Sequence, residues 1–208
     1  MIKGWNHVLF WGALWGIVEA TVGHLLHLVA LPLGWLFWFP IAVGFMQMVY
    51  SQTKQITAVF YAALVAAAIK MVDLMVPVRI DYVLNPAVSI ILEGLAVVAV
   101  FWVLVKKNKA RPVFTGAGLV AVSTLWRLFY LIYVHFLPER FYLISPAASI
   151  RLLLDFILIQ NAGNILTLYL LAQGVAKTNR SVRTWRFSPH PTFAVGVLLT
   201  AVVLQWWI

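Results

Sequence analysis

The chain has no cysteine, and charged residues make up only 10% of its 208 residues. The absence of cysteine excludes disulfide bonds, thiolate catalysis and cysteine-ligated iron–sulfur clusters. Soluble domains average about 25% charged residues. Here 63% of the residues are hydrophobic, and they are gathered in runs close to the roughly 20 residues that cross a bilayer as a helix. The sequence therefore predicts an all-α, polytopic membrane bundle.

Acidic residues are the scarcer charge: six Asp and Glu stand against 15 Lys and Arg, for a net charge of +9. The basic residues are not spread as on a nucleic-acid-binding face, and no reading motif accompanies them. Two clusters lie between apolar runs, namely Lys106, Lys107, Lys109 and Arg111, and then Lys177, Arg180, Arg183 and Arg186. Clusters in such places set membrane orientation, so we expect no nucleic-acid partner.

The apolar runs predict about seven transmembrane helices in a single domain, 1–208. They are 8–29, 36–50, 56–76, 86–105, 113–136, 146–176 and 191–208. An inner N-terminus leaves only Arg79 and Arg140 in outer loops, so the charge bias predicts N-in and C-out in the cell (inner) membrane. No run has the short core and cleavage site of a signal peptide, so we expect the first helix to be retained.

Three of the runs open in a similar way, which predicts hairpin repeats at about 8–50, 56–105 and 113–176, with 191–208 as an extra helix. Asn85-Pro86-Ala87 and Ser145-Pro146-Ala147 are the closest copies, and Phe39-Pro40 is a weaker third. Each opening is interpreted as a helix start at the outer face, with proline in the first turn and, in two copies, Asn or Ser as the cap. The alternative is that Pro-Ala is simply a good helix start. The run 146–176 exceeds the bilayer thickness, so it must tilt, project or break near Gly163.

Seven ionisable residues lie within the predicted spans. They are Glu19, Lys70, Asp73, Glu93, Arg127, Arg151 and Asp155. Such residues are costly in a membrane and usually face a partner or a cavity. In the predicted orientation most of them lie in the outer half, which indicates a polar pocket open to the outside. The alternative is structural: Lys70 with Asp73, and Arg151 with Asp155, are spaced to neutralise each other on one helix face.

Two further patterns in the first span admit two interpretations each. Gly12, Gly16 and Ala20 form a small-residue stripe that allows close helix approach, either within the protein or with a docking partner. His24 and His27 share a helix face and could ligate a metal or haem, or form a hydrogen-bonded pair at the interface, which we prefer. We find no nucleophile elbow, zinc-protease helix or phosphate-binding loop, and predict no catalytic residue and no enzyme.

In plan, the chain resembles the substrate-binding S subunits of energy-coupling-factor (ECF) vitamin transporters: small, basic, N-in proteins of six helices that capture a vitamin or related nutrient from outside. The resemblance implies that Gly12, Gly16 and Ala20 dock a membrane coupling subunit, which in turn binds ATPases. It also implies a set of pocket residues, namely Glu93, Arg127, Tyr130, Arg151, Asp155 and Asn164. The seventh span departs from the family plan. The start Met1-Ile2-Lys3-Gly4 lacks the early histidine of members that carry metals.

These observations favour a non-enzymatic transport subunit that sits in the lipid bilayer and binds a small molecule, without a cofactor. The alternative is a non-catalytic membrane anchor of a larger complex, holding haem or quinone through His24 and His27.

Overall fold

The computed structural model describes residues 4–28, 34–105, 116–138, 145–178 and 187–207, and these form helices and short connections without any strand. The helical elements, in chain order, are α1 (Trp5–Leu28), α2 (Gly34–Thr53), α3 (Ile56–Lys70), the 3-10 helix η1 (Met71–Met75), α4 (Ile80–Val105), α5 (Gly116–His135), the 3-10 turn η3 (Pro146–Ala148), α6 (Ile150–Leu154), the π-helical turn η4 (Asp155–Ile159), α7 (Gln160–Thr178) and α8 (Pro191–Trp207). The predicted all-α bundle is confirmed at this level.

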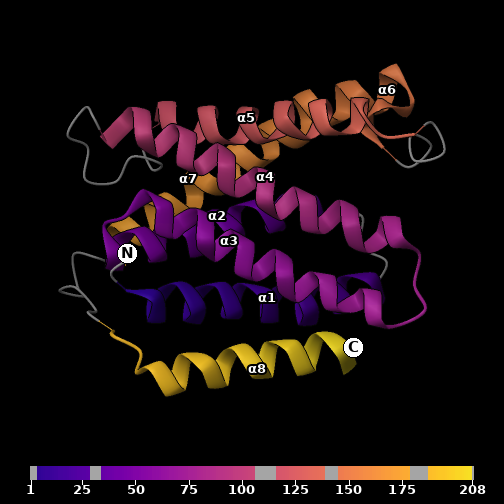
Figure 1. Cartoon of the computed structure of the whole chain (residues 1–208). Coiled ribbons are helices and arrows are strands. Elements are labelled where there is room, and N and C mark those ends of the chain that lie inside the picture. The colour runs from indigo at the N-terminus through magenta and orange to yellow at the C-terminus, as the bar shows by residue number, and fades with distance from the viewer. Residues whose placement is uncertain (1–3, 29–33, 106–115, 139–144, 179–186, 208) are drawn as a thin grey trace.

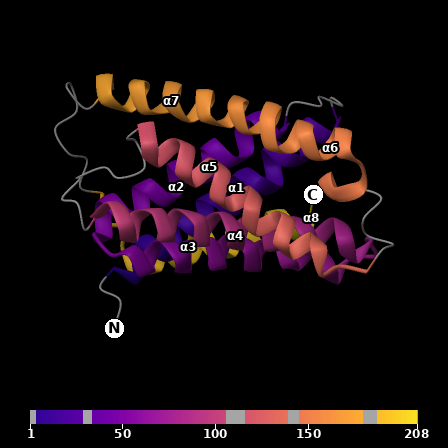
Figure 2. The same ribbon diagram turned by 90° about the horizontal axis from the view of Figure 1, so that it is seen from above.

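Six of the long helices pack as a closed ring in the order α1, α3, α4, α5, α7, α2 and back to α1. α8 lies outside this ring against α1 (Figure 1). α7 packs against α2 and α5 and lies along one edge of the bundle when it is seen from above (Figure 2). α1 begins at one end of the bundle and α8 finishes at the other (Figure 1). The last helix, predicted as an addition to three hairpins, therefore packs on the outer side of the ring, against α1.

In the part of the chain that the structure describes, four helical segments are long and apolar enough to cross a membrane: Ile56–Met75, Ile80–Leu104, Gly116–His135 and Ile150–Gly174. The apolar helix Pro191–Trp207 is shorter. Large apolar side chains remain exposed on these helices, among them Leu158 and Ile159 on η4 and Leu199 on α8. Such surfaces are compatible with a membrane location.

The predicted helix starts at Pro40 and Pro86 are wrong, because both prolines lie inside longer helices. Proline removes one backbone hydrogen bond, so it is tolerated inside a helix where the freed carbonyl finds another donor. The carbonyl four residues before Pro40 belongs to Leu36, and the Thr167 hydroxyl donates to it at 3.2 Å. At Pro146 the capping is as predicted, because the Ser145 hydroxyl accepts from Ala147 N and proline occupies the first turn. The turn is only the short η3, however, and the long helix begins at Ile150 with Ser149 as its cap.

The long run 146–176 is not broken at Gly163. It is interrupted at Ser149, whose extended backbone separates η3 from α6. At η4 the hydrogen-bond pattern widens to a π-helical turn, and the helical segment continues from Ile150 to Gly174. Gly163 lies within α7 and contacts α2: a Cβ added there would lie 2.6 Å from the Trp35 ring and 2.9 Å from Leu36. This glycine allows α7 to approach α2 closely, which is a packing role that the sequence does not separate from a helix-breaking one.

The small-residue stripe of α1 packs against α3 of the same chain. A Cβ added at Gly12 would lie 2.8 Å from the Ala62 carbonyl oxygen, and one at Gly16 would lie 2.6 Å from Ile69 Cδ1. Ala20, the third member, is buried. Gly12 and Gly16 are therefore packed within the protein, as one of the two interpretations expects. The docking of a coupling subunit stays a prediction.

Candidate functional site

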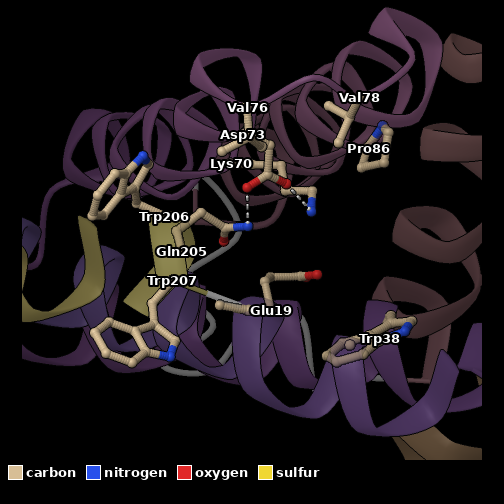
Figure 3. Close-up of a pocket in the computed structure, with 12 residues that line it drawn as sticks. Glu19, Trp38, Lys70, Asp73, Val76, Val78, Pro86, Gln205, Trp206 and Trp207 are labelled. Atoms are coloured by element: carbon tan, nitrogen blue, oxygen red, sulfur yellow. Dashed lines mark hydrogen bonds and ion pairs between the residues drawn. The ribbon is translucent and has the colours of Figure 1, made fainter. Parts of the chain in front are cut away.

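A cavity of about 570 Å³ lies where α1, α3 and α8 come to their ends and α4 begins. Its lining combines charged, amide, aromatic and apolar side chains, which Figure 3 shows converging from separate helices. They are Glu19, Ala20, Gly23, Trp38, Lys70, Asp73, Val76, Val78, Pro86, Gln205, Trp206 and Trp207. Ligand sites in proteins commonly have volumes of roughly 300–1,000 Å³ and a few convergent polar groups, so this cavity has suitable dimensions for a small molecule.

One wall of the cavity is a hydrogen-bonded triad. Lys70 Nζ lies 2.7 Å from Asp73 Oδ2, and Gln205 Nε2 of α8 donates to Asp73 Oδ1 at 2.6 Å (Figure 3). The local cause is the change from α3 to the tighter η1, because side chains three residues apart in a 3-10 helix lie almost directly above one another. The pairing of Lys70 with Asp73 expected from their spacing is confirmed.

Glu19 of α1 lies across the cavity from this triad (Figure 3). Its Oε1 accepts a hydrogen bond from Trp15 Nε1 at 3.1 Å, one helical turn earlier. Lys70 attracts it electrostatically, but the direct ion pairs among the described residues are Lys70–Asp73 and Arg79–Asp81. Glu19 is therefore a carboxylate in the cavity without a cation in direct contact.

Tryptophan rings complete the cavity. The Trp38 ring lies 3.7 Å from the position of a Cβ built on Gly23, so the absence of a side chain at Gly23 leaves space beside the ring. Trp206 and Trp207 are 58% and 79% exposed and lie at the end of α8. The side chains that line the cavity thus include charged groups on the η1 and α1 sides and an aromatic ring on the α2 side, and α8 contributes both an amide and two aromatic rings.

A second polar cluster lies between α5, α7 and α2, centred on Arg127, which is only 2% exposed. Its Nε donates to the Phe156 carbonyl at 2.9 Å and its Nη2 donates to Asn164 Oδ1 at 2.6 Å. Its Nη1 donates to the carbonyl and the hydroxyl of Ser123, at 2.9 and 3.0 Å. Asn164 Nδ2 in turn donates to the Trp35 carbonyl of α2 at 2.7 Å. The cluster therefore joins three helices through buried hydrogen bonds.

Two backbone irregularities, the π-helical turn η4 and the proline inside α2, each leave a carbonyl free to accept a hydrogen bond in this cluster. In η4 the Gln160 N–H bonds the Asp155 carbonyl five residues back, which leaves the Phe156 carbonyl to Arg127. In α2 proline at position 40 leaves the Leu36 carbonyl to Thr167 and, at 3.4 Å, to Asn164. A buried carbonyl without a donor is destabilising, so the polar side chains of α5 and α7 compensate for two irregular backbones.

The structure brings together some of the six pocket residues that the resemblance implied. Arg127 and Asn164 are bonded to each other, and the Tyr130 ring lies 5.9 Å from the Phe156 ring beside them. Asp155 begins η4 and accepts from Gln160 Nε2 at 2.8 Å rather than pairing with Arg151, which is exposed on α6. None of the six lines the cavity.

Glu93, the sixth of these residues, lies on α4 between the two clusters and is 7% exposed. Ser89 Oγ lies 3.5 Å from its Oε1, at the limit of a hydrogen bond. It is attracted by Arg127 and repelled by Glu19. Glu93 therefore links the Arg127 cluster and the cavity electrostatically, without a direct ion pair to either.

Sequence reasoning named Glu19, Lys70 and Asp73 as buried charges but did not join them to Gln205 or Trp38. The available signal for Gln205 is that it is the one side-chain amide in the otherwise apolar run 191–208. Within the described residues no group of three His, Cys, Asp or Glu is placed to hold a metal ion. The side chains of His24 and His27 lie outside the described residues.

No protein-family model matches this chain, and neither a curated protein nor a solved structure matches it.

Proposed function

We propose that this chain is a multi-pass membrane protein that binds a small molecule in the cavity bounded by α1, η1, α4 and α8. The observation that carries the proposal is the cavity lining. Three of the chain's few ionisable residues, Glu19, Lys70 and Asp73, meet around one space of about 570 Å³. In an apolar bundle, charged groups that converge on a cavity usually serve a ligand or ion.

Membrane insertion is supported by the four long apolar helices and by the apolar side chains exposed on the outside of the bundle. The basic loop clusters favour a cytoplasmic N-terminus. In that orientation α1 and α3 run outward and α4 runs inward, so the cavity lies near the outer surface. We propose that the ligand enters from outside the cell, as in the S subunits that the chain resembles in plan.

The proposal does not include docking through Gly12 and Gly16, because α3 covers both residues. The Gly12→Leu or Gly16→Leu variants would disturb the packing of α1 on α3, so loss of a partner in them would not identify a docking surface. A coupling subunit with ATPases would have to use another surface of the bundle.

The proposed function is tested by identifying what the purified protein retains. We would extract the full chain in a mild detergent and analyse bound compounds by native mass spectrometry. The matched variants are Gly23→Phe, which places a ring in the cavity beside Trp38, and Gly196→Phe, which points into open space on α8. We expect a small molecule in the wild type and in Gly196→Phe, and its loss in Gly23→Phe. Retention of phospholipid alone, equally in all three proteins, would contradict the proposal.

A further inference from the structure

The charges around the cavity do not balance, and the imbalance is located at Glu19. The carboxylate of Asp73 is occupied on both oxygens, by Lys70 Nζ and by Gln205 Nε2. Lys70 and Asp73 thus neutralise each other at 2.7 Å. Glu19 receives only the neutral Trp15 N–H in direct contact. The lining therefore has one negative charge more than it has positive charges, and a low-dielectric surrounding makes such an excess strongly felt.

The hydrogen-bonding groups are also unbalanced, because acceptors exceed donors. Gln205 is 6% exposed, and its Oε1 is buried without a donor. Its amide orientation is set by the bond from Nε2 to Asp73, because the carboxylate can only accept. A buried acceptor without a donor is destabilising. Gln205 Oε1 is enclosed by protein atoms, so the carboxylate of Glu19 is the acceptor that remains for a group that enters the cavity.

An aromatic wall accompanies these acceptors. Trp38 lines the cavity opposite the triad, and Trp206 and Trp207 line it at the α8 end (Figure 3). Tryptophan is the side chain whose ring attracts cations best, and it also accommodates apolar groups. A ligand that carries both a positive charge with N–H donors and an apolar body matches all three features of the lining.

We propose that the ligand of this cavity is an organic ammonium ion. Its charged nitrogen is held by the carboxylate of Glu19, and its apolar part lies against Trp38. This inference rests on the proposed function and adds the ligand class to it. Lys70 is the remaining cationic group of the lining, but it is neutralised by Asp73 and does not reverse the excess negative charge.

Three probes of similar size test the ligand class: 2-phenylethylammonium, 2-phenylethanol and 3-phenylpropionate. Binding to the full-length protein in detergent is measured by isothermal titration calorimetry at pH 7, with the Gly23→Phe variant as the reference for uptake by the micelle. Hydrogen bonds to charged groups contribute enough that we expect the ammonium ion to bind at least about tenfold more tightly than the alcohol or the carboxylate.

Two isosteric variants locate the preference. Glu19→Gln keeps the shape and the acceptor for Trp15 but removes the charge, so we expect it to abolish the preference for the ammonium ion. Asp81→Asn is the matched control, because Asp81 pairs with Arg79 and does not line the cavity. We expect Asp81→Asn to bind the ammonium ion as the wild type does.

Each other outcome has a distinct meaning. Equal binding of the three probes, lost in Gly23→Phe but unchanged in Glu19→Gln, overturns the ammonium ligand and leaves a small-molecule cavity. Tighter binding of the carboxylate also overturns it and assigns the selectivity to Lys70. If no probe binds the wild type, the ammonium inference fails, and the retained-ligand experiment then decides the proposed function separately.

Discussion

Arg127 illustrates how a charged residue inside an apolar bundle can be held without a carboxylate in contact. Its guanidinium donates to two backbone carbonyls, a hydroxyl and an amide oxygen, all from α5, η4 and α7. Two aromatic rings, Trp126 and Phe156, lie 4.8 and 5.2 Å from its central carbon. The planar donor geometry of Arg suits such a set of acceptors. The hydrogen bonds of Arg127 therefore hold α5 against η4 and α7.

Replacement of Arg127 tests this structural role. In Arg127→Leu the Phe156 carbonyl and Asn164 Oδ1 lose their donor inside the bundle. An unsatisfied buried group costs about 1–3 kcal/mol, so we expect a loss of at least about 2 kcal/mol in the free energy of unfolding, measured by denaturant titration in detergent. Arg151→Leu, at an exposed position on α6, is the control and should change it by less than about 0.5 kcal/mol. Equal effects in the two variants would refute the assignment.

Helices α1 and α3 approach each other through glycine, which makes their contact sensitive to single methyl groups. The nearest neighbour of a Cβ at Gly12 is the Ala62 carbonyl oxygen, a backbone atom that cannot rotate away. Around a Cβ at Gly196 on α8 there is open space. A side chain can therefore be added at Gly196 without a clash but not at Gly12, although both glycines lie in apolar helices.

We expect Gly12→Ala to lower the free energy of unfolding by about 1–3 kcal/mol, the usual cost of overpacking. Gly196→Ala should leave it unchanged or raise it by up to about 1 kcal/mol, since Ala favours helix over Gly. Thermal unfolding in detergent, followed by circular dichroism, compares the two. A Gly12→Ala protein as stable as Gly196→Ala would show that α1 and α3 are not in such close contact.

In α2, the carbonyl that Pro40 leaves without a backbone donor is hydrogen-bonded by a side chain of α7. Thr167 lies within 3.2 Å of the Leu36 carbonyl that Pro40 leaves free, and also near two carbonyls of its own helix. With alanine at position 40, a backbone N–H becomes present and can bond Leu36 as in a regular helix. The hydroxyl of Thr167 should then contribute less to the free energy of unfolding.

A double-mutant cycle of Pro40→Ala and Thr167→Val measures this dependence. We expect Thr167→Val to destabilise the wild type more than it destabilises the Pro40→Ala protein, with a coupling energy of about 0.5–1 kcal/mol. The free energies of unfolding of all four proteins give the value. Additive effects would show that Thr167 does not compensate for the proline.

At the scale of the whole molecule, the two ends of the bundle carry different polar features. The turn at Lys54 connects α2 to α3 at one end, and η1 with its polar triad lies at the other end of α3. The charge bias of the loops favours a cytoplasmic position for the Lys54 end. We therefore expect the cavity to face away from the cytoplasm.

The lack of cysteine allows a direct test of this orientation, because any introduced thiol is the only one present. Met75 is 79% exposed at the end of η1, and Lys54 is exposed in the turn between α2 and α3. We expect a membrane-impermeant maleimide to label Met75→Cys in intact cells. It should label Lys54→Cys only after the membrane is opened. The reverse pattern would place the cavity on the cytoplasmic side.

Composition and local spacing were enough to predict an all-α bundle, the approximate positions of its helices and the pairing of Lys70 with Asp73. These depend on apolar run length and on neighbours three residues apart. They did not locate the starts of α2 and α4, because whether Pro40 interrupts a helix depends on a donor from α7, more than a hundred residues away.

The candidate site was decided by the tertiary structure. Gln205 bonds Asp73 across 132 positions of sequence, and Asn164 reaches the Trp35 carbonyl across 129. In helices that are apolar on nearly all sides, the hydrophobic pattern does not indicate which side faces another helix. The sequence by itself determined that a few charges lie in an apolar chain. Only the packing of α8 against α1 and η1 decided that Asp73 is bonded by both Lys70 and Gln205, and that Glu19 lies in a cavity without a cation in direct contact.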